Sequence, residues 1–443
     1  MSYSSGHNLC RPLLIFTGLA MIYYYTFIIL PNQNPTSSFS SPLKTTKPHF
    51  STPTNLSHLA FVLLGSEKAW HKRKSYIESW WRPNSTRGLL YLDVGPTGDL
   101  LPWSPASPPY RVSQNLTDFV HRTKARSPVI IRLVHGIKEA LAELDDHENL
   151  RWLVMGDDDS VFLVDNIVDV LAGYDHNQYY YIGGQSEFIM SNHWFSFNQG
   201  FGGAGFMLSY PLAKALAKDM ENCLTRHGGL IGADTITMAC VADVGVNLSP
   251  HKGIHQIDLR GDISGFLSSH PKSPLLSLHH FDKVDPIFPT MDRFESTRHL
   301  MKAAAVDQSR MLQQTICYHR PSNWSFSISW GYSAHIYEKI MTRSYLQKPI
   351  ETFRTWSSTP RARPHYMFNT RLPSNGSCEA PHVFFFERVN KSATGIVTTY
   401  SRAAARGLPT CWDDGHSADL VSEIRVLSQV TKRKEVQLIS HLK

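Results

Sequence analysis

Arg151-Trp-Leu-Val-Met-Gly-Asp-Asp-Asp-Ser160 is a short apolar run that breaks at a glycine onto three consecutive carboxylates. An unbroken apolar run is typical of a parallel strand that is covered on both faces of its sheet. The residues that follow, Val161 to Leu171, carry apolar side chains at helical spacing. We therefore expect an acidic turn at the carboxyl end of a buried strand, where open α/β sheets bind their ligands.

Three adjacent carboxylates repel one another, and a divalent cation would neutralise them. Mg²⁺ and Mn²⁺ prefer oxygen ligands, commonly one or two carboxylates completed by substrate phosphates. Alternate residues of an extended segment project to the same side, so Asp157 and Asp159 are expected to share one ion while Asp158 points elsewhere. The alternative is a solvated acidic loop or a helix N-terminus enriched in Asp. The apolar strand before the triplet favours the metal site.

Five segments in the same order resemble one protein superfamily. Trp152-Leu-Val-Met-Gly-Asp-Asp-Asp-Ser-Val-Phe162 resembles the Asp-X-Asp segment of the fringe and β-1,3-galactosyltransferase superfamily, most closely its plant fringe-like branch. The other four are Ser57-His-Leu-Ala-Phe-Val-Leu-Leu-Gly-Ser66, Arg73-Lys-Ser-Tyr-Ile-Glu-Ser-Trp-Trp-Arg-Pro83, Gly202-Gly-Ala-Gly-Phe-Met-Leu-Ser209 and Leu276-Ser-Leu-His-His-Phe-Asp282. The resemblance covers residues 55 to 425.

This resemblance implies a fold and a reaction. The fold is an α/β domain of GT-A type, with a mixed, mainly parallel sheet flanked by helices, and in the plant branch a β-rich C-terminal extension follows. The reaction is inverting transfer of a sugar from a UDP-sugar to an acceptor hydroxyl, with a β-1,3 linkage expected. The implied partners are the UDP-sugar and a glycan, glycoprotein or small glycosylated acceptor.

Composition places the chain among globular proteins. It has 443 residues, of which 42% are hydrophobic and 18% charged, so it can bury one large α/β core or two smaller ones. The formal net charge of +7 suits an anionic ligand such as a nucleotide. Nucleic-acid binding is not expected, because the basic residues are scattered and form no stripe interleaved with aromatic residues.

The N-terminal segment predicts a membrane anchor. Residues 12–30 carry no charge and are just long enough to cross a hydrocarbon core of about 30 Å as a helix. A secretory signal peptide is the alternative, but the segment lacks a convincing small-residue cleavage site. Residues 1–11 would be a cytoplasmic leader, and the type II orientation in the Golgi follows from the resemblance.

The remaining chain divides by composition. Residues 31–54 are rich in Ser, Thr, Pro and Asn, as expected for a flexible stem. We expect the transferase domain at residues 55–309 and the β-rich extension and tail at residues 310–443. N-glycosylation sequons, which together with the anchor favour a lumenal domain, begin at Asn55, Asn84, Asn115, Asn247, Asn323, Asn375 and Asn390.

The cysteine pattern predicts disulfides rather than zinc. Cys10 precedes the anchor, which leaves five cysteines on the lumenal side, so one of the five must stay unpaired. Cys223 and Cys240 flank the segment that contains Asp234 and are the expected pair. No Cys-X-X-Cys or Cys/His spacing indicates a zinc site.

Two groups of residues are candidate nucleotide or sugar contacts. In the resembled family, the end of the first strand and the basic segment after it face the nucleotide, so we count Arg73 as a contact. Asp93, at the end of the next apolar run, and Asp158 are further candidates. Gly203, Ala204 and Gly205 belong to a glycine-rich segment that lets a backbone approach a ligand, although a hinge would use the same residues.

Asp234 is the candidate catalytic base. The resembled family carries two adjacent acidic residues that open a helix at this position, and one of them is the base. Here the second residue is Thr235. A carboxylate at the beginning of a helix is also a plausible N-cap. The departure leaves open whether the protein is active.

His279 and His280 are the candidate histidine ligands. They follow an apolar run, and the resemblance implies that one His of this segment completes the metal shell, with His279 the first choice and His280 the second. His255 is a third candidate. An imidazole beside two carboxylates shifts the expected ion from Mg²⁺ toward Mn²⁺.

Two other classes of function remain as alternatives. A catalytically inactive relative that binds UDP or a glycan would explain Thr235. A lumenal hydrolase with paired carboxylates is disfavoured, because its two carboxylates usually come from separate elements, about 5 to 9.5 Å apart across a cleft. The contiguous triplet does not have that arrangement.

Overall fold

The computed structural model describes residues 52–145, 149–357, 363–412 and 417–432. The chain divides at residue 52, and the unit from Pro53 to Lys443 contains the described helices and strands. The predicted leader at 1–11, the anchor at 12–30 and most of the stem lie outside the described residues. Within the described ranges, no helix has both the length and the apolar character needed to cross a bilayer.

A seven-stranded mixed sheet forms the centre of the unit, in the order β3-β2-β1-β4-β7-β6-β8. The first four of these strands are parallel, β7 runs antiparallel to both of its neighbours, and β6 and β8 are again parallel. This confirms the expected mixed, mainly parallel sheet. The strands are β1 (Leu59–Leu64), β2 (Gly88–Leu92), β3 (Tyr110–Val112), β4 (Trp152–Asp157), β6 (Tyr181–Gly183), β7 (Phe206–Ser209) and β8 (Leu248–Pro250).

Both faces of this sheet are buried. Successive side chains of a strand point to opposite faces, and the odd-numbered residues of β1 join one hydrophobic cluster while the even-numbered residues join another. Helices α4, α7 and α8 contribute to the second cluster, and α2, α5 and α10 to the first. These helices are α2 (Glu67–Glu78), α4 (Pro128–Leu144), α5 (Val164–Leu171), α7 (Tyr210–His227), α8 (Ala233–Asp243) and α10 (Arg293–Val306).

The segment after the acidic turn differs from its prediction. The helical spacing predicted one helix from Val161 to Leu171, but Val161–Phe162 forms the short strand β5, which pairs antiparallel with β11 (Ser277–His279). Strand β9 (Ile254–Gln256) runs parallel to β11 on its other side. Two strand-forming residues after the turn thus tie it to the segment that carries His279. Periodicity does not detect a partner more than 100 residues away.

Shorter elements connect these parts. Strand β10 pairs antiparallel with β15 and so joins the α/β part to the C-terminal half. The short elements are β10 (Leu259–Gly261), β15 (Phe353–Thr355), α3 (Thr117–Thr123), α6 (Ile189–Trp194), α9 (Ser264–Ser269) and α11 (Arg343–Leu346).

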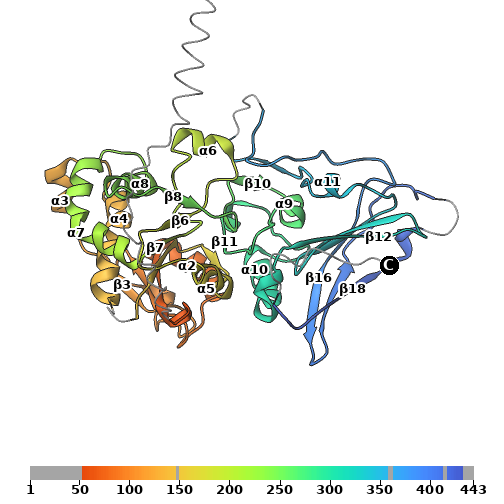
Figure 1. Cartoon of the computed structure of the whole chain (residues 1–443), viewed down its shortest axis with the longest axis horizontal. Helices are drawn as coiled ribbons and strands as arrows, with labels where there is room; N and C mark the ends of the chain where they lie inside the picture. The colour runs from red at the N-terminus through yellow and green to blue at the C-terminus, as the bar shows by residue number, and fades with distance from the viewer. Residues whose placement is uncertain (1–51, 146–148, 358–362, 413–416, 433–443) are drawn as a thin grey trace, which may run out of the picture. The chain divides into compact units, whose positions relative to one another are not determined.

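The C-terminal half is an antiparallel sheet of six strands in the order β12-β13-β14-β16-β17-β18. It begins close to the predicted start of the β-rich extension, and Figure 1 shows it in teal and blue beside the red-to-green α/β part. Its strands are β12 (Gln314–His319), β13 (Trp324–Ser329), β14 (Ser333–Tyr337), β16 (His382–Lys391), β17 (Ile396–Arg402) and β18 (Glu423–Ser428).

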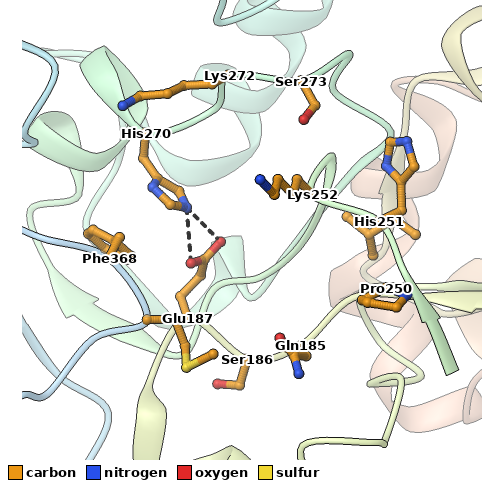
Figure 2. Close-up of a pocket in the computed structure, with 12 residues that line it drawn as sticks. Gln185, Ser186, Glu187, Pro250, His251, Lys252, His270, Lys272, Ser273 and Phe368 are labelled. Atoms are coloured by element: carbon orange, nitrogen blue, oxygen red, sulfur yellow. Dashed lines mark hydrogen bonds and ion pairs between the residues drawn. The ribbon is translucent and has the colours of Figure 1, made fainter. Parts of the chain in front are cut away.

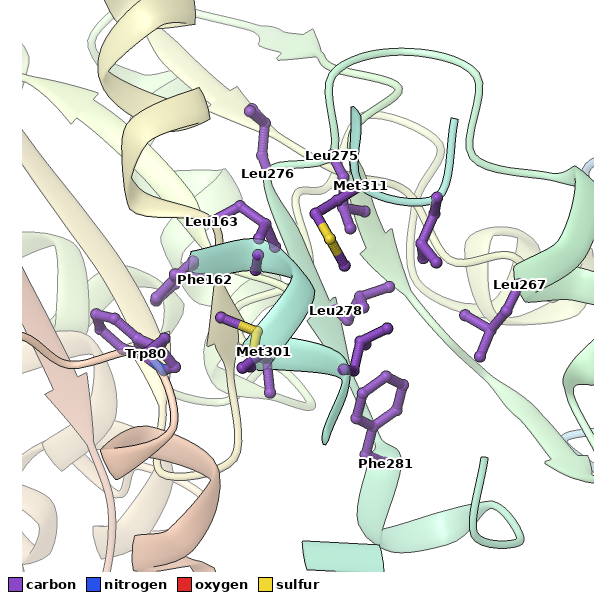
Figure 3. Close-up of a cluster of buried hydrophobic side chains, with 14 of the residues drawn as sticks. Trp80, Phe162, Leu163, Leu267, Leu275, Leu276, Leu278, Phe281, Met301 and Met311 are labelled. Carbon is purple, nitrogen blue, oxygen red and sulfur yellow. The ribbon is translucent and has the colours of Figure 1, made fainter. Parts of the chain in front are cut away.

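One hydrophobic cluster runs through both halves. Its members include Leu59 in β1 and Tyr400 in β17. Figure 3 shows its middle, where Met301 of α10 and Met311 lie among Phe162, Leu278 and their neighbours. Burying apolar surface stabilises a fold by about 25 cal/mol per Å². The extension therefore shares its core with the α/β part.

The predicted disulfide is present. Cys223 of α7 and Cys240 of α8 are bonded, so the helix that carries Asp234 is fixed to its neighbour. A second bond joins Cys378 and Cys411 in the extension, and Cys317 of β12 is free. Sequence alone left these three cysteines unassigned.

Candidate active site

The acidic turn lies at the C-terminal end of β4, between β4 and β5. Ser160 closes the turn, because its Oγ accepts a hydrogen bond from the Asp157 amide at 2.8 Å and donates one to the Gly203 carbonyl at 2.6 Å. Gly156 has no room for a side chain, since a Cβ there would lie 2.8 Å from the Phe162 ring. The turn is thus fixed to the glycine-rich segment.

The three carboxylates diverge from this turn. Ligand atoms of Asp157, Asp159 and His279 all lie within 4.8 Å of one another. Asp158 points the other way, toward the end of β1, where its Oδ2 accepts from the Ser66 amide at 3.3 Å. A Cβ on Gly65 would lie 2.7 Å from that oxygen, so the glycine permits the approach. The structure therefore brings together the three residues expected to share one ion and separates Asp158 from them.

A chain of hydrogen bonds sets the tautomer of His279. The Gln256 amide donates from Nε2 to Asp258 Oδ1 at 3.0 Å, so its Oε1 faces His279 Nδ1 at 2.9 Å. Nδ1 must then carry the proton that is donated, which leaves the other ring nitrogen, Nε2, 3.1 Å from Asp159 Oδ1. A neutral imidazole held in this way presents a lone pair toward a carboxylate. Nε2 therefore either carries a second proton and donates to Asp159, or leaves its lone pair for a cation bound between the two atoms.

The electrostatics of the cluster agree with this geometry. Burial lowers the pKa of His279, but the Asp159 carboxylate more than offsets it and raises the pKa to about 9. Burial works to raise the pKa of Asp159, yet the charges of His279 and Arg73 outweigh it and hold the pKa well below its usual range. Burial raises the pKa of Asp157 to about 7. The field at the imidazole is therefore strongly negative, as a site for a cation requires.

A divalent cation fits these residues. Asp159 is 1% exposed, and its Oδ2 has no hydrogen-bond partner among the described residues. The Arg73 guanidinium lies 3.3 Å from that oxygen as an ion pair. Two carboxylates and one imidazole nitrogen form a hard to borderline donor set, which suits Mn²⁺.

Arg73 of α2 is bound by the acidic residues around the turn. Its guanidinium donates to Asp158 Oδ1 and to Asp282 Oδ2, each at 2.7 Å. The same side chain lines a cavity of about 650 Å³ together with His71, Lys72 and Arg293. Arg73 thus lies between the carboxylates of the turn and a hollow whose lining holds basic residues together with Asp282 and Asp292. Its predicted role as a nucleotide contact stays a prediction.

Asp93 lies at the end of β2, on the edge of the sheet where β1 and β4 also end. Its Oδ1 accepts from the Glu67 amide, at the first residue of α2, at 2.8 Å. The carboxylate is exposed. The structure therefore gives it a part in holding the start of α2 and leaves its other oxygen toward solvent.

The glycine-rich segment lies between the Asp157–Asp159–His279 cluster and the candidate base. A Cβ on Gly203 would lie 2.1 Å from His279 Cε1, and one on Gly202 would lie 2.5 Å from Asp234 Oδ1. Consecutive Cα atoms are about 3.8 Å apart, so the two side chains contact neighbouring residues of one short backbone segment. Gly205 adopts a φ of +90° and has no room for a side chain beside the Phe162 ring. The glycines thus allow both functional groups to approach closely, and Ala204 between them is fully buried.

Asp234 does not cap its helix. Helix α8 begins after Gly232, which takes the N-cap position with a φ of 94°, so Asp234 is the second residue of the first turn. The N-cap interpretation is therefore wrong, because the glycine supplies a backbone conformation that puts the cap two residues earlier. Burial raises the pKa of Asp234 to about 6, although the hydrogen bond from the Gly202 backbone and the charge of His279 act to lower it. A carboxylate with this pKa is suited to accept a proton near neutral pH.

Thr235 stands where the resembled family has a second acid. Its Oγ1 donates to the Gln199 side-chain oxygen at 2.9 Å. Gln199 ends the polar segment that follows β6, and it is almost fully buried. The hydroxyl therefore connects the start of α8 to that segment.

His280 packs against His279 and contacts Asp258. Its backbone has a φ of +73°, and its Nδ1 lies 3.0 Å from Asp258 Oδ1. Its ring lies against His279, at a centroid distance of 3.8 Å and a tilt of 31°, and stacks on Trp356 at 4.6 Å and 11°. The Arg260 guanidinium lies 4.3 Å from the Trp356 ring centroid. A stack thus runs from the metal cluster to the C-terminal extension.

The third histidine candidate lies in a different cluster. His255 neighbours Gln256 on β9, and its Nδ1 is 2.6 Å from Glu187 Oε1. Successive strand residues face opposite sides, which places the two clusters on opposite sides of β9. Sequence reasoning missed Gln256, Asp258 and Trp356, which support His279 and His280. In the sequence, the only indication of Gln256 and Asp258 is that they lie near the candidate His255. Trp356 comes from a distant segment.

Two family models match the chain. The model described as "Protein of unknown function, DUF604" matches residues 191–441, more than half of the chain. The model described as "Fringe-like" matches residues 112–260, which include the acidic turn, the glycine-rich segment and Asp234. The two matches overlap across the segments around Asp234. No curated protein matches the chain.

Proposed function

Since the chain belongs to the DUF604 family and to the fringe-like glycosyltransferase superfamily, we propose that it transfers a sugar from a UDP-sugar to an acceptor hydroxyl, with inversion and with a divalent metal. The observation that carries the proposal is the convergence of Asp157, Asp159 and His279 beside the segment that contacts Asp234. Metal-bound diphosphate and catalytic base must lie close together in such a transfer.

Asp157, Asp159 and the Nε2 lone pair of His279 would hold the ion. Mn²⁺ bound there would offset the negative charge that develops on the departing UDP. Gln256 keeps the imidazole in the tautomer that can bind, and Arg73 adds a fixed positive charge beside Asp158 and Asp159. Lys72 and Arg293 in the cavity next to Arg73 support the placement of the nucleotide on this side. Asp93, at the same edge of the sheet, is proposed to contact the nucleotide.

Asp234 is proposed as the base. Its carboxylate accepts the proton of the acceptor hydroxyl, whose oxygen forms the new bond to the anomeric carbon. The bond from that carbon to the UDP oxygen breaks on the opposite face, and its electron pair leaves with UDP. Ionised Asp234 is required at the start of this step, and a pKa of about 6 keeps it ionised at neutral pH. The backbone of residues 202–205 would lie against the sugar.

The β-1,3 linkage and the Golgi location are further proposals, and they rest on the superfamily. A type II Golgi protein has its catalytic unit in the lumen, where disulfides form, and the two disulfides support this compartment. Protease treatment of intact microsomes tests it. Digestion of residues 60–440 without detergent would show the opposite topology.

A donor screen tests the proposed reaction. The purified protein is incubated with individual UDP-sugars and Mn²⁺, with and without candidate glycan acceptors, and free UDP and product are both measured. We expect UDP release that depends on Mn²⁺ and rises with one acceptor class. Equal UDP release with Mn²⁺ and with excess chelator would contradict metal dependence.

A non-catalytic UDP- or glycan-binding protein is the second candidate, and Thr235 is the observation that favours it. Such a protein would bind UDP with Mn²⁺ but release none from any UDP-sugar. The hydrogen bond from Thr235 to Gln199 supports this candidate, because the contact needs no acid at residue 235. The donor screen separates the two candidates.

Trp356 of the extension is predicted to support the metal site. Trp356→Ala removes the ring that stacks on His280, and His280 in turn stacks on His279. Loss of such an indirect support typically weakens metal binding about 10- to 100-fold, and we expect about 10-fold because His279 keeps its bond to Gln256. Mn²⁺ titration of the protein measures it.

Trp356→Phe should restore most of that affinity, because a flat ring still stacks on the imidazole. Trp412→Ala serves as the control, since Trp412 is an exposed tryptophan of the same extension that bonds the Glu338 carbonyl. Equal Mn²⁺ affinity in Trp356→Ala and in the unmodified protein would show that the stack has no such role.

A further inference from the structure

A second cavity lies on the other side of β9 from the metal cluster. Its volume is about 400 Å³, within the range of ligand-binding pockets. Four separate segments form it: residues 185–187 after β6, residues 250–254 around β8 and β9, residues 270–273 after α9, and residues 367–368 of the C-terminal extension. The extension therefore completes a pocket in the α/β part.

The single carboxylate in the wall of this cavity already contacts two imidazoles. Glu187 Oε1 lies 2.6 Å from His255 Nδ1, and Glu187 Oε2 lies 3.0 Å from His270 Nε2. Burial works to raise the pKa of Glu187, but the two imidazoles outweigh it and lower the pKa to about 2. Figure 2 shows Glu187 and His270 joined in this way. Both carboxylate oxygens of Glu187 thus already have partners within the protein.

Two lysines line the same cavity. Lys252 and Lys272 make no hydrogen bond or ion pair within the described ranges of the chain. In Figure 2, Lys252 extends from one wall toward the Glu187–His270 pair. Burial lowers the pKa of Lys272. Positive charge therefore exceeds negative charge in the lining.

The rest of the lining combines a ring with small polar groups. Phe368 lies against His270 at a ring-centroid distance of 4.1 Å and forms an apolar wall. Gln185 and Ser273 supply an amide and a hydroxyl group, whereas the buried Ser186 hydroxyl is bonded to Asp258. A few polar groups around an apolar wall are what a pocket for a small polar ligand requires. A sugar ring has the matching apolar face and hydroxyl edge.

The cavity is connected to the proposed active site through bonded residues. Ser186 in its wall donates to Asp258 Oδ2 at 2.6 Å, and Asp258 in turn holds Gln256 beside His279. Gln185 opens the segment that ends at Gln199, the partner of Thr235. A ligand in the cavity would thus contact the segment next to the base.

We propose that this cavity binds an anionic sugar unit of the acceptor, with Lys252 facing its acidic group, Lys272 adding positive charge to the lining and Phe368 facing its ring. The proposal rests on the proposed function, because it names the class of acceptor. The acidic group is a carboxylate, a sulfate or a phosphate ester, which share the negative charge. A divalent cation at Glu187, His255 and His270 is disfavoured, since the two lysines repel it.

Ligand binding to the full-length protein in detergent tests the proposal. The probes are glucuronate, glucose 6-sulfate and glucose 6-phosphate, with glucose as the uncharged match. We expect one or more of the charged sugars to bind more tightly than glucose, and the tightest identifies the acidic group. Lys252→Gln and Lys272→Gln should each weaken that binding about fivefold, the upper range for an exposed charge pair. Equal binding of glucose and the charged sugars would overturn the proposal.

Matched variants separate this result from other causes. Lys218→Gln removes the same charge from an exposed site on α7 and should leave binding unchanged. Inorganic phosphate that binds as tightly as every charged sugar would overturn the assignment to a sugar. Zn²⁺ binding that is lost in His270→Asn would show that the cluster is a metal site instead. UDP binding with Mn²⁺ is measured in parallel, so that failure of the proposed transferase function is detected independently.

Discussion

Asp159→Ala is expected to abolish the Mn²⁺-dependent part of UDP binding. Asp159 supplies the most buried carboxylate of the cluster, and its Oδ2 has no hydrogen-bond partner within the described residues. Removing it leaves His279 and Arg73 with one negative partner fewer, so the site loses both a ligand and the charge that attracts a cation. We expect a loss of about 100-fold or more in UDP affinity with Mn²⁺, since the effect of a direct ligand should exceed the 10- to 100-fold typical of its supports.

Two further variants keep this result interpretable. Asp159→Asn preserves the shape of the side chain and removes its charge. We therefore expect it to fold even if the alanine variant folds poorly, and still to fail to bind Mn²⁺. Asp165→Asn is the control: Asp165 pairs with Arg82 through an exposed ion pair near the same turn, and its loss should cost less than about 1 kcal/mol of stability. Equal UDP affinity in Mn²⁺ and in chelator, for the unmodified protein, would show that the acidic turn does not act through a metal.

The parts of the fold that sequence predicted are those set by local pattern. β1 and β4 are unbroken apolar runs, and each lies in the centre of the sheet, where both faces are covered. The carboxylate triplet follows β4 directly, so its place at the end of a strand needed no knowledge of distant contacts. The separation of Asp158 from its two neighbours likewise follows from the alternation of an extended segment.

The parts that sequence did not predict depend on contacts between distant segments. Trp356 reaches His280 only because β15 pairs with β10, and no periodicity in either segment indicates that pairing. Glu187, His255 and His270 come from three separated segments and meet beside β9. Asp234 was open to interpretation as an N-cap because a positive φ at Gly232 is not visible in the residue types alone.

Asp234→Asn is expected to lower turnover by about 10²- to 10⁴-fold, the usual range for loss of a general base, while UDP and Mn²⁺ affinities stay nearly unchanged. The amide keeps the shape and can still accept from the Gly202 backbone, but it cannot take a proton. In the unmodified protein, kcat/KM should fall as the pH drops through about 6, because Asp234 becomes protonated there. That inflection should be missing from the residual activity of the variant.

Asp234→Asn is also expected to change the stability of the fold, and this change distinguishes a catalytic base from a structural residue. The folded pKa of Asp234 is raised above that of an exposed Asp by burial, so ionising it destabilises the fold as the pH rises from about 4 to about 6. Asparagine does not ionise, and the variant should therefore melt at a higher temperature than the unmodified protein at pH 7.5, with the difference shrinking toward pH 4. A variant that melts lower at pH 7.5 and keeps full turnover would show that Asp234 is structural.

If the unmodified protein binds UDP but turns over no donor, Thr235→Asp tests whether the missing second acid is the cause. Turnover gained in that variant would assign the defect to residue 235, and continued inactivity would count against Asp234 as a base in this site.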